Sequence, residues 1–148
     1  LHKNGIKIRI IGDRTRFADD IRDLLAKAEA QTRDNTRLNL TIALSYGARA
    51  EITDAMREIA AKVATGELAP SDISEDLIEQ HLSTSGIPDP DLLIRTSGEQ
   101  RISNFLLWQS AYTEFVFEDV LWPDFDRSHL EQAIDNFAGR ERRFGAVI

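Results

Sequence analysis

Extended apolar segments alternate with segments of helical period along most of this chain. "IKIRIIG" (6–12) and "LNLTIALSY" (38–46) have the alternation and the isoleucine and leucine content of half-buried or buried strands. "DLLIRT" (91–96) is a shorter third candidate. Because strands that alternate with helices are joined by right-handed crossovers, this order predicts an α/β fold with a mostly parallel sheet flanked by helices.

Apolar residues at helical spacing predict the helices that accompany these strands. Such spacing occurs in the segments 17–28 and 52–63, on either side of the second strand. The segment 64–74 contains glycine and proline and is expected to be a loop, after which Ser74 is expected to cap a short helix through Leu82.

The last helix is predicted to begin at a capping box formed by Ser128 and Glu131. Its buried positions are expected to be Leu130, Ile134 and Phe137. The preceding segment 115–126, "FVFEDVLWPDFD", concentrates aromatic side chains and, taken alone, indicates core.

The composition excludes several classes of protein. A chain of 148 residues with no linker or repeat is expected to form one domain. The net charge of -7 argues against nucleic acid as a partner, which normally needs a basic face. The absence of cysteine excludes disulfides and thiolate metal sites and is compatible with a cytoplasmic protein. No apolar run approaches the roughly 20 residues that a membrane span requires.

The loop "RTSGEQRIS", residues 95–103, follows the third predicted strand and concentrates cations and hydroxyls. In open α/β sheets ligands bind beyond the carboxyl ends of the strands, which is where this loop begins. Arg95 and Arg101 carry forked donors that match phosphate oxygens, and Ser103 or one of its neighbours is expected to begin a helix whose N–H groups would add positive charge. Gly98 would let the backbone turn closely past a ligand. These features predict a diphosphate cradle.

Ion pairing offers a simpler interpretation of the same residues. Arg95 and Arg101 could pair with Glu99 or Asp91 on the surface, with Ser103 as an ordinary helix cap. On spacing alone this alternative is favoured, because neither a Walker nor a dinucleotide-binding glycine signature is present.

A longer stretch changes that balance. "DLLIRTSGEQRISNFLLWQSAYTEFVFEDVLWPDFD" (91–126) resembles the signature of the cis-prenyltransferases, in particular the bacterial undecaprenyl diphosphate synthases. The similarity extends upstream through "IRIIGDRTRF" and "LNLTIALSYGARAEI" and downstream to "RERRFG", so it covers essentially the whole chain. A match of this length and order is much more specific than a short motif.

The resemblance implies roles for particular residues. Arg95, Arg101, Ile102 and Ser103 match the positions that hold the diphosphate of isopentenyl diphosphate, with Asp91 and Glu99 as supports of the arginines. Glu114 matches a glutamate that contributes to a Mg²⁺ site. "RRFG" is similar to a C-terminal element that reaches the partner subunit's site, which makes Arg143 a candidate substrate-binding residue. Gln100 and Ala50 depart from the histidine and tryptophan common at these positions.

The implied reaction is condensation of isopentenyl diphosphate onto an allylic diphosphate such as farnesyl diphosphate, each new double bond being cis. The product would be a long-chain polyprenyl diphosphate, a lipid carrier for cell-wall synthesis. The resemblance further implies Mg²⁺, a homodimer, and a cytoplasmic enzyme that contacts the inner membrane face peripherally when it releases its product.

One part of the family pattern has no counterpart here. The family's DGNGRWA-type loop, with an aspartate essential for Mg²⁺ and the allylic diphosphate, is absent from the sequence, and so no catalytic residue is assigned. Residues 1–148 are therefore interpreted as the C-terminal portion of a single cis-prenyltransferase domain without its N-terminal strands, inactive alone. The alternatives are a noncatalytic partner subunit, which would tend to lose the arginines, and a phosphate-binding module.

Overall fold

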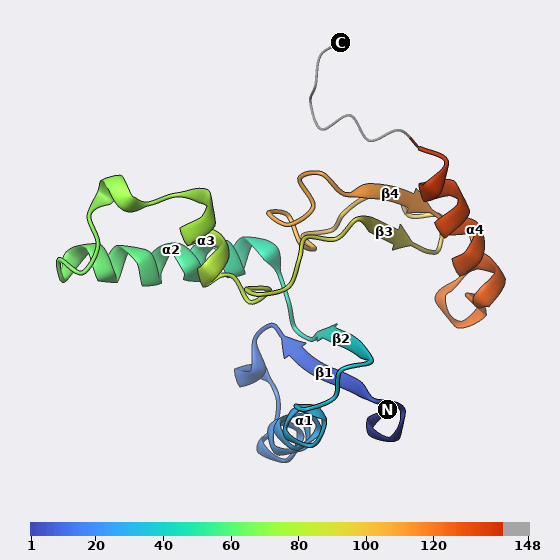
Figure 1. Ribbon diagram of the computed structural model, residues 1–148, viewed down its shortest axis with the longest axis horizontal. Coiled ribbons are helices and arrows are strands. Elements are labelled where there is room, and N and C mark those ends of the chain that lie inside the picture. Colours follow the sequence, from blue (N-terminus) through green and yellow to red (C-terminus); the bar gives the residue numbers. More distant parts are fainter. Residues whose placement is uncertain (141–148) are drawn as a thin grey trace, which may run out of the picture. The chain divides into compact units, whose positions relative to one another are not determined.

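The computed structural model describes residues 1–140 and divides the chain into two compact units, Leu1–Ile87 and Pro88–Ile148. Figure 1 shows the first unit with strands β1 and β2 and helices α1 to α3, and the second with β3, β4 and α4. None of the helices in residues 1–140 combines the length and apolarity that crossing a membrane requires.

In the first unit, strands β1 (Ile6–Ile11) and β2 (Leu38–Ala43) pair in parallel, with Ile6 opposite Leu38 and Ile11 opposite Ala43. Helix α1 (Asp19–Thr32) connects them and packs against β1. This arrangement confirms the predicted strand–helix–strand unit and its parallel pairing. Ile10 and Ile11 belong to its core, each with 5% of its surface exposed.

Side chains close the edge of β1 that faces away from β2. Glu29 accepts a hydrogen bond from the N–H of Ile10 at 2.7 Å, and Thr32 accepts one from the N–H of Ile8 at 3.0 Å. The carbonyls of Ile6 and Ile10 accept bonds from the side chains of Asn35 and Arg14. Because these bonds satisfy the outward-facing N–H groups of Ile8 and Ile10 and two of the carbonyls, β1 is protected along most of this edge.

Helices α2 (Ala48–Ala64) and α3 (Glu75–His81) complete the first unit and lie side by side (Figure 1). α2 buries a stripe at helical spacing that includes Ala48, Ala55 and Ile59. Ser74 caps α3 as predicted, because its Oγ accepts a hydrogen bond from the N–H of Leu77 at 3.2 Å.

In the second unit, strands β3 (Leu92–Arg95) and β4 (Glu114–Phe117) pair in parallel, with Leu92 opposite Glu114 and Arg95 opposite Phe117. The sequence pattern predicts β3 but not β4, whose residues fall in the aromatic segment expected to be core. Each unit thus contains a two-stranded parallel sheet, β1–β2 in the first and β3–β4 in the second. Short 3-10 turns occur at His2–Asn4, Arg14–Arg16, Pro70–Asp72 and Trp122–Asp124.

Helix α4 (Arg127–Ala138) packs against β4 but begins before the predicted capping box. Its N-cap is Asp126, whose carboxylate accepts bonds from the N–H groups of Ser128 and His129 at 2.9 and 3.2 Å. Hydrogen bonds from Ser128 and His129 lower the pKa of Asp126 to about 2. A carboxylate caps a helix terminus at least as well as serine, which explains the earlier start.

The buried face of α4 also differs from the prediction. Leu130 and Ile134 are 43% and 47% exposed, whereas Ala133 is fully buried and Phe137 is half-buried. The small side chain of Ala133 lets the helix lie close to the neighbouring backbone, and the larger apolar residues on either side of it remain on the surface.

Candidate functional site

The predicted cradle begins where β3 ends. One guanidinium nitrogen of Arg95, Nη1, donates a hydrogen bond to Oγ of Ser103 at 2.9 Å and another to the backbone carbonyl of Arg101. Arg95 therefore joins the end of the strand to the far side of its own loop. The structure thus brings together Arg95, Arg101 and Ser103, as the sequence predicts.

Residues beyond β4 hold the near side of this loop. The N–H of Ser97 donates to the carbonyl of Val120 at 2.8 Å, and that of Gly98 donates to the carbonyl of Glu118 at 2.9 Å. Gly98 has φ +66°, and a Cβ there would lie 3.2 Å from Oδ1 of Asp119. The left-handed backbone and this close approach together explain the glycine.

The far side of the loop is not the helix N-terminus that the sequence pattern predicts. Ser103, Asn104 and Leu106 have φ values of +48°, +61° and +46°, which belong to the left-handed region. Residues with such φ values cannot begin a right-handed helix, and segment 103–112 consists of turns and bends. Positive charge at this site therefore comes from guanidinium groups rather than from a helix dipole.

A hollow of about 240 Å³ opens beside the two arginines. Its polar wall carries Arg95, Arg101 and Ser103, and its other lining residues are Leu93, Ile94, Ile102 and Phe105. The hollow thus combines cationic donors with an apolar wall.

The two arginines differ in their ionic partners. Arg101 forms an ion pair with Glu99, as the simpler interpretation predicts, and its side chain is 64% exposed. Arg95 forms no ion pair with a carboxylate of residues 1–140, and its hydrogen bonds go to the uncharged carbonyl oxygen of Arg101 and the hydroxyl of Ser103. A half-buried guanidinium whose charge no neighbouring carboxylate neutralises is suited to an anionic ligand.

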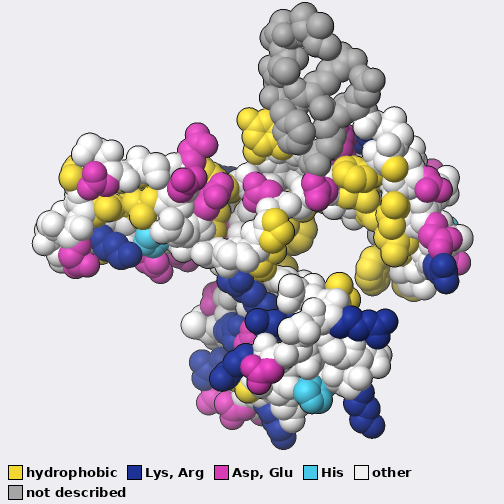
Figure 2. Space-filling model, in the orientation of Figure 1, with side chains coloured by type: hydrophobic (Ala, Val, Ile, Leu, Met, Phe, Trp, Pro, Cys, Tyr) yellow, Lys and Arg dark blue, Asp and Glu magenta, His cyan; other side chains and the backbone are white. Residues whose placement is uncertain are grey.

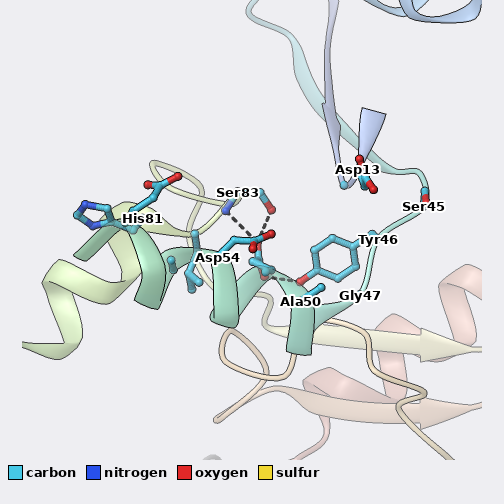
Figure 3. Close-up of a pocket in the computed structure, with 13 residues that line it drawn as sticks. Asp13, Ser45, Tyr46, Gly47, Ala50, Asp54, His81 and Ser83 are labelled. Atoms are coloured by element: carbon cyan, nitrogen blue, oxygen red, sulfur yellow. Dashed lines mark hydrogen bonds between the residues drawn. The ribbon is translucent and has the colours of Figure 1, made fainter. Parts of the chain in front are cut away.

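A second hollow, of about 370 Å³, lies in the first unit at the carboxyl ends of β1 and β2 (Figure 3). Gly12 and Asp13 follow β1 there, and Ser45, Tyr46 and Gly47 follow β2. A Cβ on Gly12, which has φ +106°, would lie 2.1 Å from the carbonyl oxygen of Leu44, so no other residue fits.

Glu51 organises this second hollow. Its Oε2 accepts a hydrogen bond from the hydroxyl of Tyr46 at 2.5 Å, and its Oε1 accepts bonds from the N–H of Ser83, at 2.8 Å, and from the Ser83 hydroxyl. In Figure 3 dashed lines from the labelled Tyr46 and Ser83 mark these hydrogen bonds. Glu51 thus ties the turn after β2 to the segment after α3.

Comparisons with known proteins identify the family of the chain. The family described as "Putative undecaprenyl diphosphate synthase" matches residues 1–145. The chain belongs to this family.

Named relatives support the membership. An isoprenyl transferase of Brucella suis biovar 1 is 56% identical over 147 residues, which are 99% of this chain and 58% of the relative. The farnesyl-diphosphate-specific ditrans,polycis-undecaprenyl-diphosphate synthase of Xanthomonas axonopodis pv. citri is 53% identical over 98% of this chain and 56% of its own length. The chain thus spans less than two thirds of the relatives that it matches.

A solved structure has the same fold. Lavandulyl diphosphate synthase from Lavandula x intermedia, solved in complex with dimethylallyl diphosphate, is 44% identical and superposes with a TM-score of 0.93. The match covers 95% of this chain and 61% of that protein. The α/β fold class predicted from the resemblance is therefore confirmed.

Two residues that the family resemblance singles out lie away from the cradle. Glu114 is the first residue of β4, and its carboxylate is 2.8 Å from Nη1 of Arg140. Asp91 precedes β3, and its carbonyl accepts the N–H of Glu114 at 3.0 Å. Arg143 lies outside the described residues, so its predicted role stays a prediction.

The Mg²⁺ site implied by the undecaprenyl diphosphate synthase family does not fit residues 1–140 by themselves. No group of three or more histidine, aspartate or glutamate side chains gathers there in an arrangement that could hold a metal ion. Glu114 is the one described acidic residue that the resemblance assigns to the metal, and a cation already occupies its carboxylate.

Sequence reasoning missed the network of Glu51, Tyr46 and Ser83. From the sequence, Ser45, Tyr46 and Gly47 end the second predicted strand, where they could line a crevice or, by default, form a turn, and Ser83 lies in no motif. The available signal was the position of Tyr46 beyond a parallel strand, where crevices form in α/β folds. Ala50, one of the family departures, lines the same hollow.

Proposed function

We propose that this chain provides the isopentenyl diphosphate site of a cis-prenyltransferase. The enzyme would condense isopentenyl diphosphate onto an allylic diphosphate such as farnesyl diphosphate and make a polyprenyl diphosphate lipid carrier for cell-wall synthesis. The observation that carries the proposal is Arg95, a cation without a carboxylate partner in residues 1–140, at a hollow shared with Arg101 and Ser103.

In this proposal the arginines bind and orient the diphosphate. Arg95 lines the hollow and supplies forked donors, and its bond to Ser103 holds the Ser103 hydroxyl beside the guanidinium. Arg101 exchanges part of its interaction with Glu99 for a phosphoryl oxygen, since both acceptors suit a guanidinium. The apolar wall, which includes Ile102 and Phe105, lies where the isoprenoid carbons of the same ligand would need contact.

Mg²⁺ remains part of the proposal for the whole enzyme, in which it would help to neutralise the departing diphosphate. Its ligands would have to come in part from outside residues 1–140, because these residues do not gather a metal site. The role proposed for Arg95 and Arg101 needs no metal, since charge-assisted hydrogen bonds to phosphate form without one.

A homodimer is proposed from the apolar surface of the second unit. Leu121, Trp122, Leu130 and Ile134 are 43–71% exposed, and Figure 2 shows apolar side chains gathered on the visible surface beside α4. Exposed apolar clusters of this kind commonly mark protein interfaces. In such a dimer Arg143 would bind substrate in the site of the partner subunit. Peripheral contact with a membrane would serve the release of the product.

A noncatalytic partner subunit and a phosphate-binding module remain the competing functions. The first would have no reason to keep Arg95, Arg101 and Ser103 around one hollow. The second requires no more than that hollow, so only an assay of turnover distinguishes it from the proposed enzyme.

The test measures prenyl transfer by the 148-residue chain, alone and together with the part of the Brucella suis relative that it does not match. The assay contains isopentenyl and farnesyl diphosphates with Mg²⁺. We expect turnover only in the complemented sample, and loss of that turnover when Arg95 is replaced by Ala. If pyrophosphate binds but neither sample shows turnover, the phosphate-binding module is favoured. If pyrophosphate does not bind at all, the module and the proposed enzyme are both excluded.

A further inference from the structure

The carboxylate of Glu114 is held by Arg140, the last residue that the structure describes. Nη1 of Arg140 lies 2.8 Å from Oε2 of Glu114 and donates a second bond to the carbonyl of Phe115 at 3.0 Å. The side chains of Glu114 and Arg140 are 28% and 39% exposed, so the pair is partly shielded from water. One guanidinium nitrogen thus binds two consecutive residues of β4.

The strand register places Glu114 far from the cradle of its own chain. Glu114 is opposite Leu92, whereas Arg95 is opposite Phe117, three residues further along the strands. At roughly 3.3 Å per residue the two positions are about 10 Å apart along the sheet. Because successive side chains alternate between faces, Glu114 and Arg95 also project from opposite faces of the β3–β4 pair.

The backbone leaves Glu114 little freedom to change this position. Its N–H donates to the carbonyl of Asp91 at 3.0 Å, and Oγ1 of the preceding Thr113 donates to the carbonyl of Pro90 at 2.7 Å. Thr113 is only 9% exposed, so the start of β4 is anchored in the interior. A rotation of its side chain cannot bring the Glu114 carboxylate to the arginines around the hollow.

We propose that Glu114 is a positioning residue which, through Arg140, fixes the C-terminal end of α4 to the outer edge of β4, and that it is not a metal ligand within its own chain. The carbonyl of Phe115 belongs to the edge of β4 that faces away from β3, so Arg140 closes this edge as Arg14 and its neighbours close that of β1. The inference does not depend on prenyl transfer.

The test compares three variants of the chain: Glu114→Gln, Arg140→Gln, and the reversed pair Glu114→Arg with Arg140→Glu. Hydrogen exchange of the amides in the last turn of α4 reports the attachment, and calorimetric titration with MgCl₂ reports metal binding. Arg127→Gln is the matched control, because it removes an ion pair of 2.7 Å with Glu131 that lies within α4.

We expect both single variants to accelerate exchange in the last turn of α4 to the same extent, about two- to fivefold as for a partly exposed ion pair. The reversed pair is expected to recover at least half of the loss, and the control is expected to leave that turn unchanged. The Mg²⁺ titrations are expected to be the same for all variants. Weaker Mg²⁺ binding in Glu114→Gln, with stronger binding in Arg140→Gln, would establish the metal-ligand role instead. Unchanged exchange in both single variants, or no recovery in the reversed pair, would also overturn the proposal.

Discussion

Arg95 and Ser103 are eight residues apart in the chain, yet Nη1 of Arg95 donates a 2.9 Å hydrogen bond to Oγ of Ser103. The bond links the two ends of the loop after β3, and both residues line the hollow. Such a bond keeps the guanidinium in place before any ligand arrives, which reduces the entropy lost on binding.

Replacement of Arg101 by Ala is expected to weaken pyrophosphate binding by the chain. A charge-assisted hydrogen bond contributes about 1.5–3 kcal/mol, which corresponds to roughly one to two decades in affinity. Isothermal titration with pyrophosphate measures the effect without any need for turnover. In the complete enzyme the same substitution is expected to raise the KM for isopentenyl diphosphate more than that for the allylic substrate.

Arg127→Ala is the control for this experiment, since it removes an exposed arginine of α4 that does not line the hollow. A pyrophosphate affinity of Arg101→Ala that equals that of the parent chain would remove Arg101 from the cradle. An equal loss in both would mean that net charge, rather than the hollow, attracts the anion.

Replacement of Ser110 by Ala is expected to stabilise the second unit. The Oγ of Ser110 is buried and has no hydrogen-bond partner among residues 1–140. Removal of an unsatisfied buried hydroxyl is expected to recover about 1 kcal/mol of its desolvation cost. Urea unfolding of the two chains measures the difference.

Thr113→Val provides the contrasting case, because Oγ1 of Thr113 donates to the carbonyl of Pro90 at 2.7 Å. This variant keeps the shape of the side chain but leaves that carbonyl without its donor, so it is expected to destabilise the chain. A loss of stability in Ser110→Ala equal to that in Thr113→Val would show that the Ser110 hydroxyl has a partner.

Local pattern was sufficient where an element depends on its own residues. The strands at 6–11 and 38–43 and the helix after Ser74 follow from alternation and a side-chain cap, and they occur where predicted. Strand β4 was missed because four residues with three apolar side chains cannot be distinguished from general core without knowledge of their neighbour β3. The exposure of Leu130 and Ile134 likewise depends on which face of α4 meets β4.

The candidate site shows the same limit. Arg95, Arg101 and Ser103 could be grouped from sequence because one short loop carries all three. The expected helix at Ser103 was wrong, because the loop closes through left-handed residues that no spacing rule indicates. The partner of Glu114 is 26 residues away at the end of another element, and only the packing of α4 brings it to β4.

Glu29 is expected to make the stability of the first unit depend on pH. Burial alone would raise its pKa, but hydrogen bonds from Arg14 and from the N–H of Ile10 outweigh burial and hold the pKa below its ordinary value of 4.5. A lowered pKa means that the folded state binds the proton less readily than the unfolded state does. The stabilisation is therefore complete above the ordinary pKa and is lost as the pH falls through the folded-state value.

Thermal unfolding from pH 6 to pH 3 measures this contribution in the parent chain and in Glu29→Gln. The variant is expected to be less stable at pH 6 and to approach the parent as the pH falls. Glu131→Gln is the control, because its ion pair is exposed and lies within α4. Parallel pH profiles for Glu29→Gln and the parent would show that Glu29 does not link folding to protonation.

The two edges of the first sheet are not equivalent. The N–H of Leu44 donates to the carbonyl of Ile11, so alternation directs the N–H of Ile42 toward β1 and the N–H of Thr41 away from it. Within the first unit, residues 1–87, no hydrogen bond reaches the outward-facing backbone groups of Asn39, Thr41 and Ala43. β2 thus has an open edge, in contrast to the closed edge of β1.

Proline substitutions are expected to reveal this asymmetry. Thr41→Pro removes an N–H that makes no bond, and proline is tolerated on strand edges whose N–H faces outward. Ile42→Pro removes a donor to β1 and is expected to cost at least about 0.5–1.5 kcal/mol more, the contribution of one hydrogen bond. Urea unfolding, monitored by circular dichroism, measures the free energy of unfolding of both variants. Asn39→Pro serves as a second substitution at a position whose N–H faces away from β1. If Thr41→Pro and Ile42→Pro destabilise the chain equally, then the edge of β2 is paired in solution, and the strand that covers it has to be sought.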